Sequence, residues 1–119
     1  MSNNQSDRRT LKRRQLLFYL EIYNLADNQL LGHLGDITTE GLMIVSEKAL
    51  PLKKSYQVKV KLPKLPEFQK DFMQFDIETR WAQKDINPDL QCTGAIFTHS
   101  DQEYLIIIQH LIRVLGFNN

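Results

Sequence analysis

The stretch Asp36-Ile-Thr-Thr-Glu-Gly41 lies between two apolar segments that are typical of β-strands. Asp36 and Thr38 are two residues apart, so their side chains project from the same side of an extended backbone. A carboxylate beside a hydroxyl offers several acceptors and one donor, which suit a purine edge or a sugar hydroxyl. Gly41 permits a tight turn or the close approach of a ligand to the backbone. Taken alone, this pattern is explained more simply as a polar β-turn between two strands.

A second feature is the basic segment Arg8-Arg-Thr-Leu-Lys-Arg-Arg14, in which Arg9 and Arg13 form an Arg-x-x-x-Arg pattern. Residues 1–14 carry five basic side chains and one acidic side chain, whereas the remaining residues carry ten basic and thirteen acidic ones. A basic segment on a mildly acidic body indicates that the segment itself meets an anion. Because residues 1–14 have almost no apolar side chains, we expect a flexible arm. The charge is not spread over one face, so no nucleic-acid partner is predicted.

Together, Arg-x-x-x-Arg and Asp-x-Thr-x-x-Gly resemble the PilZ domain family. That family is marked by Arg-x-x-x-Arg followed by Asp/Asn-x-Ser-x-x-Gly, and its known ligand is the bacterial second messenger cyclic di-GMP. The resemblance covers nearly the whole chain, since the later strand with Trp81 and the terminal helix also fit the family's layout. Thr38 stands where the family usually has Ser, which keeps the hydroxyl and adds a methyl group. This departure bears on affinity more than on chemistry.

The resemblance implies a role for each motif residue. Arg9 and Arg13 are expected to bind guanine and phosphate, for which a guanidinium offers two parallel donors. Asp36 and Thr38 are expected to bind the ligand from the barrel, and Gly41 to shape the turn beside them. The motif therefore predicts a cyclic di-GMP site shared between the arm and the barrel.

Two further residues are candidates for the same site. Arg8 directly precedes the arginine motif, and in the family a basic residue there tends to accompany binding of two stacked ligand molecules. Trp81 begins a Trp-Ala pair on a predicted strand, a position that lies near the ligand in relatives. A core tryptophan explains Trp81 equally well, so both interpretations stay open at this point.

The rest of the chain predicts an all-β fold. A chain of 119 residues has room for one hydrophobic core, and we expect a single barrel domain over residues 15–119. Alternating apolar residues and intervening turn residues predict six strands, at residues 16–24, 30–37, 41–46, 56–62, 72–83 and 90–97. Gly94 within the last strand suggests a bulge. Six strands with hairpin-like spacing indicate a small antiparallel β-barrel.

One helix is predicted at residues 101–115. Ser100-Asp-Gln-Glu103 has the pattern of a capping box, and Gly116 is placed to end the helix. Its apolar stripe is formed by Leu105, Ile108, Ile112 and Leu115. Other apolar residues widen this stripe, so the helix is expected to pack across the barrel and to support a weak homodimer.

The sequence has no pattern typical of a metal site, a nucleoside-triphosphate site or a catalytic centre. The three histidines are scattered, and there is no glycine-rich phosphate loop and no grouping of nucleophile, base and orienting residue. We therefore expect a binding module that is not an enzyme and that holds no metal or cofactor. The sequence has no long apolar run and no secretory signal, and Cys92 is a lone cysteine. A cytoplasmic protein with a reduced thiol, not inserted in a membrane, is expected.

Three functions remain open from the sequence. The leading hypothesis is a cyclic di-GMP receptor that orders its N-terminal arm over the ligand and signals through a protein partner, for example in motility, adhesion or secretion. The alternative is a PilZ-like protein-interaction module that does not bind nucleotide. A third interpretation is a small barrel that binds RNA or single-stranded DNA, which the net acidic strands disfavour.

Overall fold

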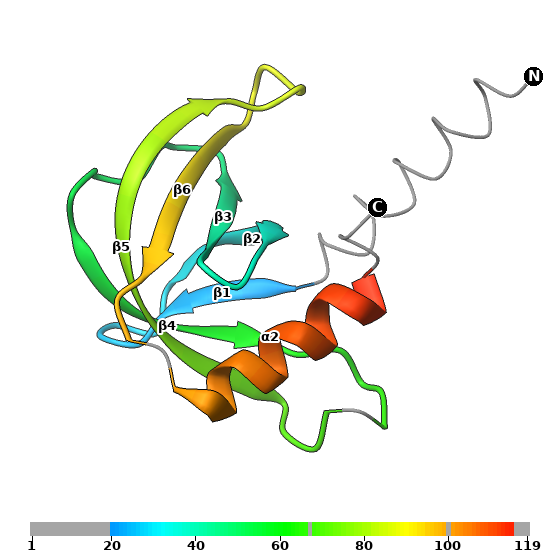
Figure 1. The fold of residues 1–119 in the computed structure, drawn as a ribbon. Coiled ribbons are helices and arrows are strands. Elements are labelled where there is room, and N and C mark those ends of the chain that lie inside the picture. The colour runs from blue at the N-terminus through cyan, green and yellow to red at the C-terminus, as the bar shows by residue number, and fades with distance from the viewer. Residues whose placement is uncertain (1–19, 67, 100, 116–119) are drawn as a thin grey trace, which may run out of the picture.

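Six β-strands and one helix form the part of the chain that the computed structural model describes, residues 20–66, 68–99 and 101–115 (Figure 1). The strands are β1 (Glu21–Asn24), β2 (Leu30–Ile37), β3 (Gly41–Ser46), β4 (Ser55–Lys61), β5 (Phe72–Lys84) and β6 (Gln91–Phe97), and the helix is α2 (Gln102–Leu115). The predicted basic arm at residues 1–14, with Arg8, Arg9 and Arg13, lies outside the described residues.

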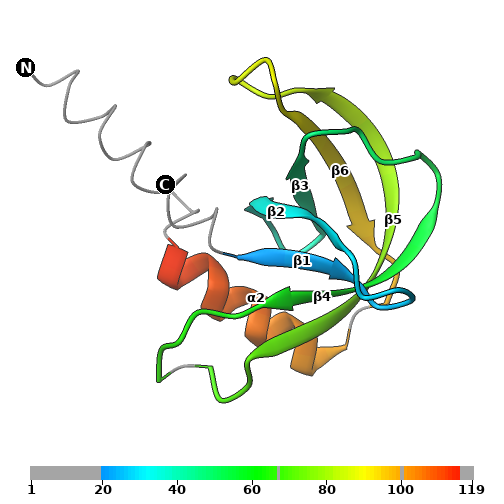
Figure 2. The ribbon, with the colours of Figure 1, turned by 180° about the vertical axis from the view of Figure 1, so that it is seen from behind.

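The strands close into an antiparallel barrel in the order β1-β2-β3-β6-β5-β4, and β4 pairs back to β1. The predicted fold class, a six-stranded antiparallel barrel followed by a helix, is therefore confirmed. Figure 2, seen from behind, shows β1 and β4 side by side where the barrel closes. Closure gives every strand of the described barrel two hydrogen-bonded neighbours, so no sheet edge stays open to other chains.

Alternation along the strands decides which side chains fill the barrel. On β5, the side chains of Met73, Phe75 and Ile77 are buried, whereas Gln74 between them is exposed. Removing such apolar surface from water contributes about 25 cal/mol per Å² and drives the strands together. Phe75 also contacts two other elements, because its ring centroid lies 5.2 Å from that of Phe97 on β6 and 5.3 Å from that of Tyr104 on α2.

The predicted strand boundaries agree closely with the structure. β2 and β3 span the predicted residues, and β4, β5 and β6 differ from prediction by one residue at one end or at both. The first strand begins at Glu21, while residues 16–19 of the prediction lie outside the described residues. In the β1–β2 turn, Asn28 has a φ of 59°, the left-handed conformation that asparagine tolerates well.

Helix α2 begins one residue later than predicted. The Asp101 carboxylate caps it, because Asp101 Oδ1 accepts a hydrogen bond of 3.0 Å from the backbone N–H of Tyr104. Ser100 itself lies outside the described residues. Ile108 and Leu111 are fully buried against the barrel, so α2 packs across one end of it as expected (Figure 1). No helix in the described ranges is both long and apolar enough to cross a membrane.

A buried threonine fastens the loop between β3 and β4 to the barrel. Thr79 on β5 is fully buried, and its hydroxyl donates to the carbonyl of Pro51 at 2.6 Å and accepts from the N–H of Lys54 at 3.1 Å. A buried hydroxyl is stable only with such partners. Thr79 therefore fixes the path of the loop and, with it, the start of β4.

Candidate functional site

Two β-bulges place one predicted site residue each on the outer surface of the barrel. On β2, Leu34 pairs with Ile44 and Asp36 pairs with Met43, so Gly35 is an extra residue. An extra residue reverses the alternation of side chains, because each later residue then faces the opposite side of the sheet. Asp36 consequently points outward, although it lies two residues after the buried Leu34.

The second bulge lies on β5 at Arg80. Thr79 pairs with Ala95 and Trp81 pairs with Gly94, so Arg80 has no partner of its own in this register. The sequence placed a bulge at Gly94, but the extra residue is on the neighbouring strand opposite Gly94. The inward-facing row that ends at Thr79 would otherwise continue to Trp81, whose side chain is instead 44% exposed. The interpretation of Trp81 as a core residue is therefore wrong.

Asp36 and Trp81 stand in one row that crosses four neighbouring strands. Asp36 pairs with Met43, Met43 pairs with Gly94, and Gly94 pairs with Trp81. Since neighbouring strands lie about 4.8 Å apart, three steps separate the two backbones by roughly 14 Å. Two residues that are distant in sequence thus face the same stretch of surface, a separation that suits a ligand larger than a single nucleobase.

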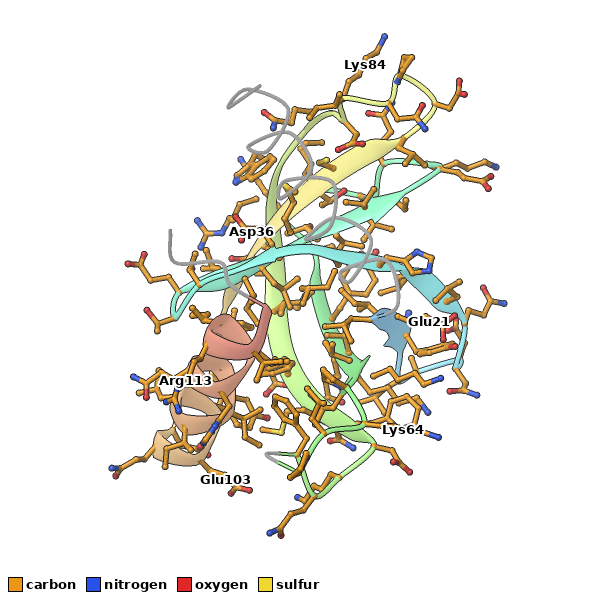
Figure 3. The ribbon with its side chains drawn as sticks, turned by 90° about the vertical axis from the view of Figure 1, so that its right-hand side faces the viewer. Glu21, Asp36, Lys64, Lys84, Glu103 and Arg113 are labelled. Carbon is orange, nitrogen blue, oxygen red and sulfur yellow. The ribbon has the colours of Figure 1, made fainter. Side chains whose placement is uncertain are left out.

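A groove of about 330 Å³ lies along this row. Four of the predicted ligand-binding residues, Asp36, Thr38, Gly41 and Trp81, line it together. The remaining lining residues are Ile37, Glu40, Leu42, Met43, Arg80, Gly94, Ala95 and Ile96. The structure thus gathers at one place the predicted residues that it describes, and Figure 3 labels one of them, Asp36, on the barrel.

The turn after β2 is held by Thr38. Its backbone N–H donates to the Gly41 carbonyl at 2.9 Å, and its Oγ1 accepts from the N–H groups of Glu40 and Gly41 at 3.1 and 3.3 Å. The hydroxyl proton stays available to donate to a ligand. Asp36 uses Oδ1 to accept from the N–H of Ile37 at 2.8 Å, and the side chain is exposed. Both groups are therefore oriented by the backbone and open to solvent.

Gly41 has a steric reason to be glycine. A Cβ atom at this position would overlap the carbonyl oxygen of Ala95 and lie 3.0 Å from the Cα atom of Ile96, both in the backbone of β6. The start of β3 therefore approaches β6 more closely than any side chain permits. This close approach sets the position of the turn that carries Thr38.

Sequence reasoning did not identify Arg80, Met43 and Ile96 as lining residues. Arg80 follows the buried Thr79 on β5 and points outward to line the groove, where its Nη2 lies 2.8 Å from Glu78 Oε1 and its Nε donates to the same oxygen at 2.9 Å. Its position in the sequence, directly before the candidate ligand-binding residue Trp81, could have indicated that Arg80 lies near the site. A guanidinium beside an exposed indole is a further candidate for contacting a phosphate or a purine.

A second hollow, of about 570 Å³, adjoins the groove on the other side of the turn. Its walls are residues 36–39 and three side chains of α2, Gln109, Ile112 and Arg113. Asp36, Ile37 and Thr38 line both spaces, so the groove and the hollow meet at the end of β2. Helix α2 thereby becomes part of the candidate site.

Metal-binding side chains do not gather near this site. Across the described ranges, no three His, Cys, Asp or Glu residues lie close enough to hold a metal ion. Cys92 is buried, and its thiol donates a hydrogen bond of 3.4 Å to Asp85 Oδ1. The chemistry available in the groove is hydrogen bonding, charge and aromatic stacking.

Comparison with known proteins rests on structure alone. No family model matches the sequence, and a search of curated proteins finds no significant match. The PilZ domain of YcgR from Escherichia coli, solved with c-di-GMP, superposes with a TM-score of 0.60 at 19% identity over 82% of each chain. The Bacillus subtilis inhibitor of motility MotI/DgrA has a TM-score of 0.64 at 14% identity and is covered over 48% of its length by 84% of this chain.

A third structure widens the comparison. The PlzA protein of Borreliella burgdorferi, in complex with c-di-GMP, has a TM-score of 0.55 at 14% identity, and 84% of this chain covers 46% of it. The chain thus spans less than half the length of MotI and of PlzA, whereas it matches most of the isolated YcgR domain. At these identities the likeness concerns the fold. The described part of the chain has the fold of the PilZ domain.

Proposed function

We propose that this protein is a receptor for cyclic di-GMP of the PilZ family, and that it acts by binding rather than by catalysis. The observation that carries the proposal is the groove in which Asp36, Thr38, Gly41 and Trp81 meet. These residues come from two separate parts of the chain. The motif Asp-x-Thr-x-x-Gly predicted the first three as ligand-binding, and Trp81 was a further candidate from the resemblance to the PilZ family. Structures of the same fold from YcgR and PlzA contain c-di-GMP.

The chemistry of the groove suits a guanine nucleotide. Asp36 offers carboxylate oxygens to the N1–H and amino group of guanine, and the Thr38 hydroxyl offers a donor beside it. The half-exposed indole of Trp81 offers a flat apolar surface for a purine, a contact worth about 1–3 kcal/mol per base. Arg9 and Arg13, outside the described residues, would close over the guanine and phosphate with bidentate contacts.

The bound state is read by a protein partner. A ligand on the groove, covered by the segment with Arg8, Arg9 and Arg13, changes both the shape and the charge of this side of the barrel. A partner that contacts this side would bind the loaded and empty forms differently. The likeness to a protein described as an inhibitor of motility makes motility one candidate output. A cytoplasmic location follows from the proposed ligand, an intracellular messenger.

One observation favours the alternative, a PilZ-like protein-interaction module that binds no nucleotide. The Thr38 hydroxyl already accepts hydrogen bonds from the N–H groups of Glu40 and Gly41, so it has a purely structural use. Thr38 therefore does not by itself require a ligand. A module of this kind would present the same barrel face directly to another protein.

Calorimetric titration with cyclic di-GMP, beside an RNA oligonucleotide, tests the proposal. Trp81 is the single tryptophan of the chain, so its fluorescence gives an independent signal from the groove itself. We expect binding of cyclic di-GMP with a change in Trp81 emission, and no binding of the oligonucleotide. Asp36→Ala and Trp81→Ala should weaken binding, because each removes a group that faces the ligand.

The matched control is Gln74→Ala, which truncates an exposed side chain of β5 outside the groove. It should bind cyclic di-GMP like the natural protein. Absence of binding by the natural protein would leave the interaction module as the better function. Binding of the oligonucleotide instead would favour the nucleic-acid interpretation.

A further inference from the structure

The hollow between the β2–β3 turn and helix α2 is lined by a positively charged side chain to which the sequence motifs assign no role. Arg113 lines this hollow together with Asp36, Thr38, Thr39 and Gln109. The Arg113 side chain is exposed, and across the described part of the chain it forms no ion pair. Figure 3 shows Asp36 and Arg113 on the same side of the molecule, Asp36 on the barrel and Arg113 on the helix below it. A guanidinium thus faces the candidate site from an element that the motifs do not include.

A structural explanation of Arg113 must be considered first. A basic side chain in the last turn of a helix interacts favourably with the unsatisfied carbonyls there, and Arg113 occupies that turn. This explanation predicts that removing Arg113 lowers the stability of the fold and leaves ligand binding unchanged. It does not account for the hollow that separates Arg113 from the β2–β3 turn.

The shapes and charges of the two spaces assign them to different parts of a cyclic dinucleotide. The groove has mainly apolar walls, among them Trp81, Met43 and Ile96, which suit the face of a guanine. The hollow has mixed walls, in which Ile37 and Ile112 lie beside polar side chains, and the guanidinium of Arg113 among them suits an anionic phosphate. Since both spaces meet at Asp36 and Thr38, one ligand that contacts these two residues reaches into both.

We propose that Arg113 of helix α2 binds a phosphate of the cyclic dinucleotide, so that the ligand bridges the barrel and the helix. This inference rests on the proposed function and adds a contact to it. The bridge ties α2 to the end of β2, an effect separate from the apolar packing of Ile108 and Leu111 beneath it. Helix α2 then reports occupancy of the site, and its exposed outer side, with Ile106, becomes a second surface that a partner can read.

The test compares Arg113→Ala, Arg113→Lys and Lys64→Ala with the natural protein by calorimetric titration with cyclic di-GMP. Lys64→Ala is the matched control, because Lys64 is an exposed cation that lines neither the groove nor the hollow, and Figure 3 shows it away from Asp36. We expect Arg113→Ala to lower the affinity about ten- to hundredfold, as removal of a charged hydrogen-bond partner does. Arg113→Lys should have an intermediate affinity, since lysine keeps the positive charge but lacks the two parallel N–H donors of the guanidinium.

Two further readouts separate a phosphate contact from a structural role. Added salt should narrow the gap in affinity between the natural protein and Arg113→Ala, because salt screens the interaction that the variant lacks. Amide hydrogen exchange in α2 should slow when cyclic di-GMP is added to the natural protein and should change less in Arg113→Ala. A change in melting temperature without a change in affinity would overturn the inference and support the helix-terminus role.

The outcomes also distinguish this inference from the function on which it rests. If Arg113→Ala binds like the natural protein while Trp81→Ala binds weakly, the receptor function stands and the role of Arg113 is wrong. If the natural protein binds no cyclic di-GMP, both proposals fail.

Discussion

The indole of Trp81 lies directly against the backbone of Gly94 on the neighbouring strand. A Cβ atom added to Gly94 would overlap Cε2, Cζ2 and Nε1 of Trp81, so a side chain of any size at position 94 displaces the ring. Gly94 is buried beneath it, and the two residues pair across β5 and β6. The absence of a side chain at Gly94 is therefore what lets the indole lie along the groove.

Gly94→Ala should move the indole and weaken ligand binding while leaving the barrel folded. The added methyl group costs about 1–3 kcal/mol of stability through overpacking. Emission of the single tryptophan should shift to longer wavelength as the ring loses its contact with the barrel, and affinity for cyclic di-GMP should fall about tenfold or more. Gln83→Ala, an exposed change on the same strand, is the control. An unchanged emission spectrum in Gly94→Ala would show that Gly94 does not position Trp81.

The alternation of apolar and polar residues was sufficient to predict most of the barrel, but it failed at the β5 bulge. Alternation is a property of successive residues, so the buried row on β5 from Met73 to Thr79 is visible in the sequence. The residues of β5 do not themselves mark Arg80 as extra, because the register is decided by pairing with β6, the strand that follows after the turn at residues 85–90. Extending the alternation past Arg80 therefore favours a core position for Trp81, which is the one of its two open interpretations that the structure contradicts.

In the candidate site, too, the features that depend on neighbouring residues could be predicted, and those that depend on packing between elements could not. Asp36, Thr38 and Gly41 belong to one short motif, so their proximity could be predicted. Arg113 could not be connected with them, because its position depends on how α2 packs across the end of the barrel. The helix cap was ambiguous for a local reason, since Ser100 and Asp101 are adjacent and both residue types favour the cap position.

Thr38→Ser and Thr38→Val should separate the hydroxyl of Thr38 from its methyl group. Serine keeps the acceptor for the N–H groups of Glu40 and Gly41, so stability and affinity should change little. Valine keeps the shape and removes the hydroxyl, which should cost about 0.5–1.5 kcal/mol of stability and weaken ligand binding. Urea unfolding and calorimetry measure the two effects. Equal losses in Thr38→Val and in its exposed neighbour Thr39→Val would show that the hydroxyl of Thr38 does not hold the turn.

Stability should fall in alkaline solution, in part through Tyr104. Burial raises the pKa of Tyr104 above its ordinary value of 10.0, and the charges of Asp76, Asp101 and Glu103 raise it further. Below pH 10 the hydroxyl is protonated in the folded and unfolded chains alike, so the contribution of Tyr104 is fully present. As the pH rises above that value, the unfolded chain releases the proton more readily, and stability is lost until the folded pKa is passed.

Tyr104→Phe removes this titration. The free energy of unfolding should therefore decline less steeply in Tyr104→Phe than in the natural protein as the pH rises above 10. Tyr104→Phe keeps the ring that contacts Phe75, so the comparison concerns the hydroxyl alone. Parallel declines in the two proteins would mean that other groups cause the alkaline loss.

Arg9→Ala and Arg13→Ala should each weaken binding of cyclic di-GMP by about 2–5 kcal/mol, the cost of removing one partner of a desolvated charged contact. Lys12→Ala, in the same segment but outside the Arg-x-x-x-Arg motif, should have a much smaller effect. Ordering the backbone of about six residues costs on the order of 6–12 kcal/mol of conformational entropy. The arginine contacts and the stacking on guanine roughly offset this cost, so the affinity should be moderate. Because the arginine contacts are ionic, the affinity should also fall with added salt. Amide hydrogen exchange across residues 8–14 should slow when the ligand is added, and this slowing should disappear in Arg9→Ala. If exchange is equally slow with and without ligand, the segment does not close over the site, and the bound state must be read elsewhere on the barrel or on α2.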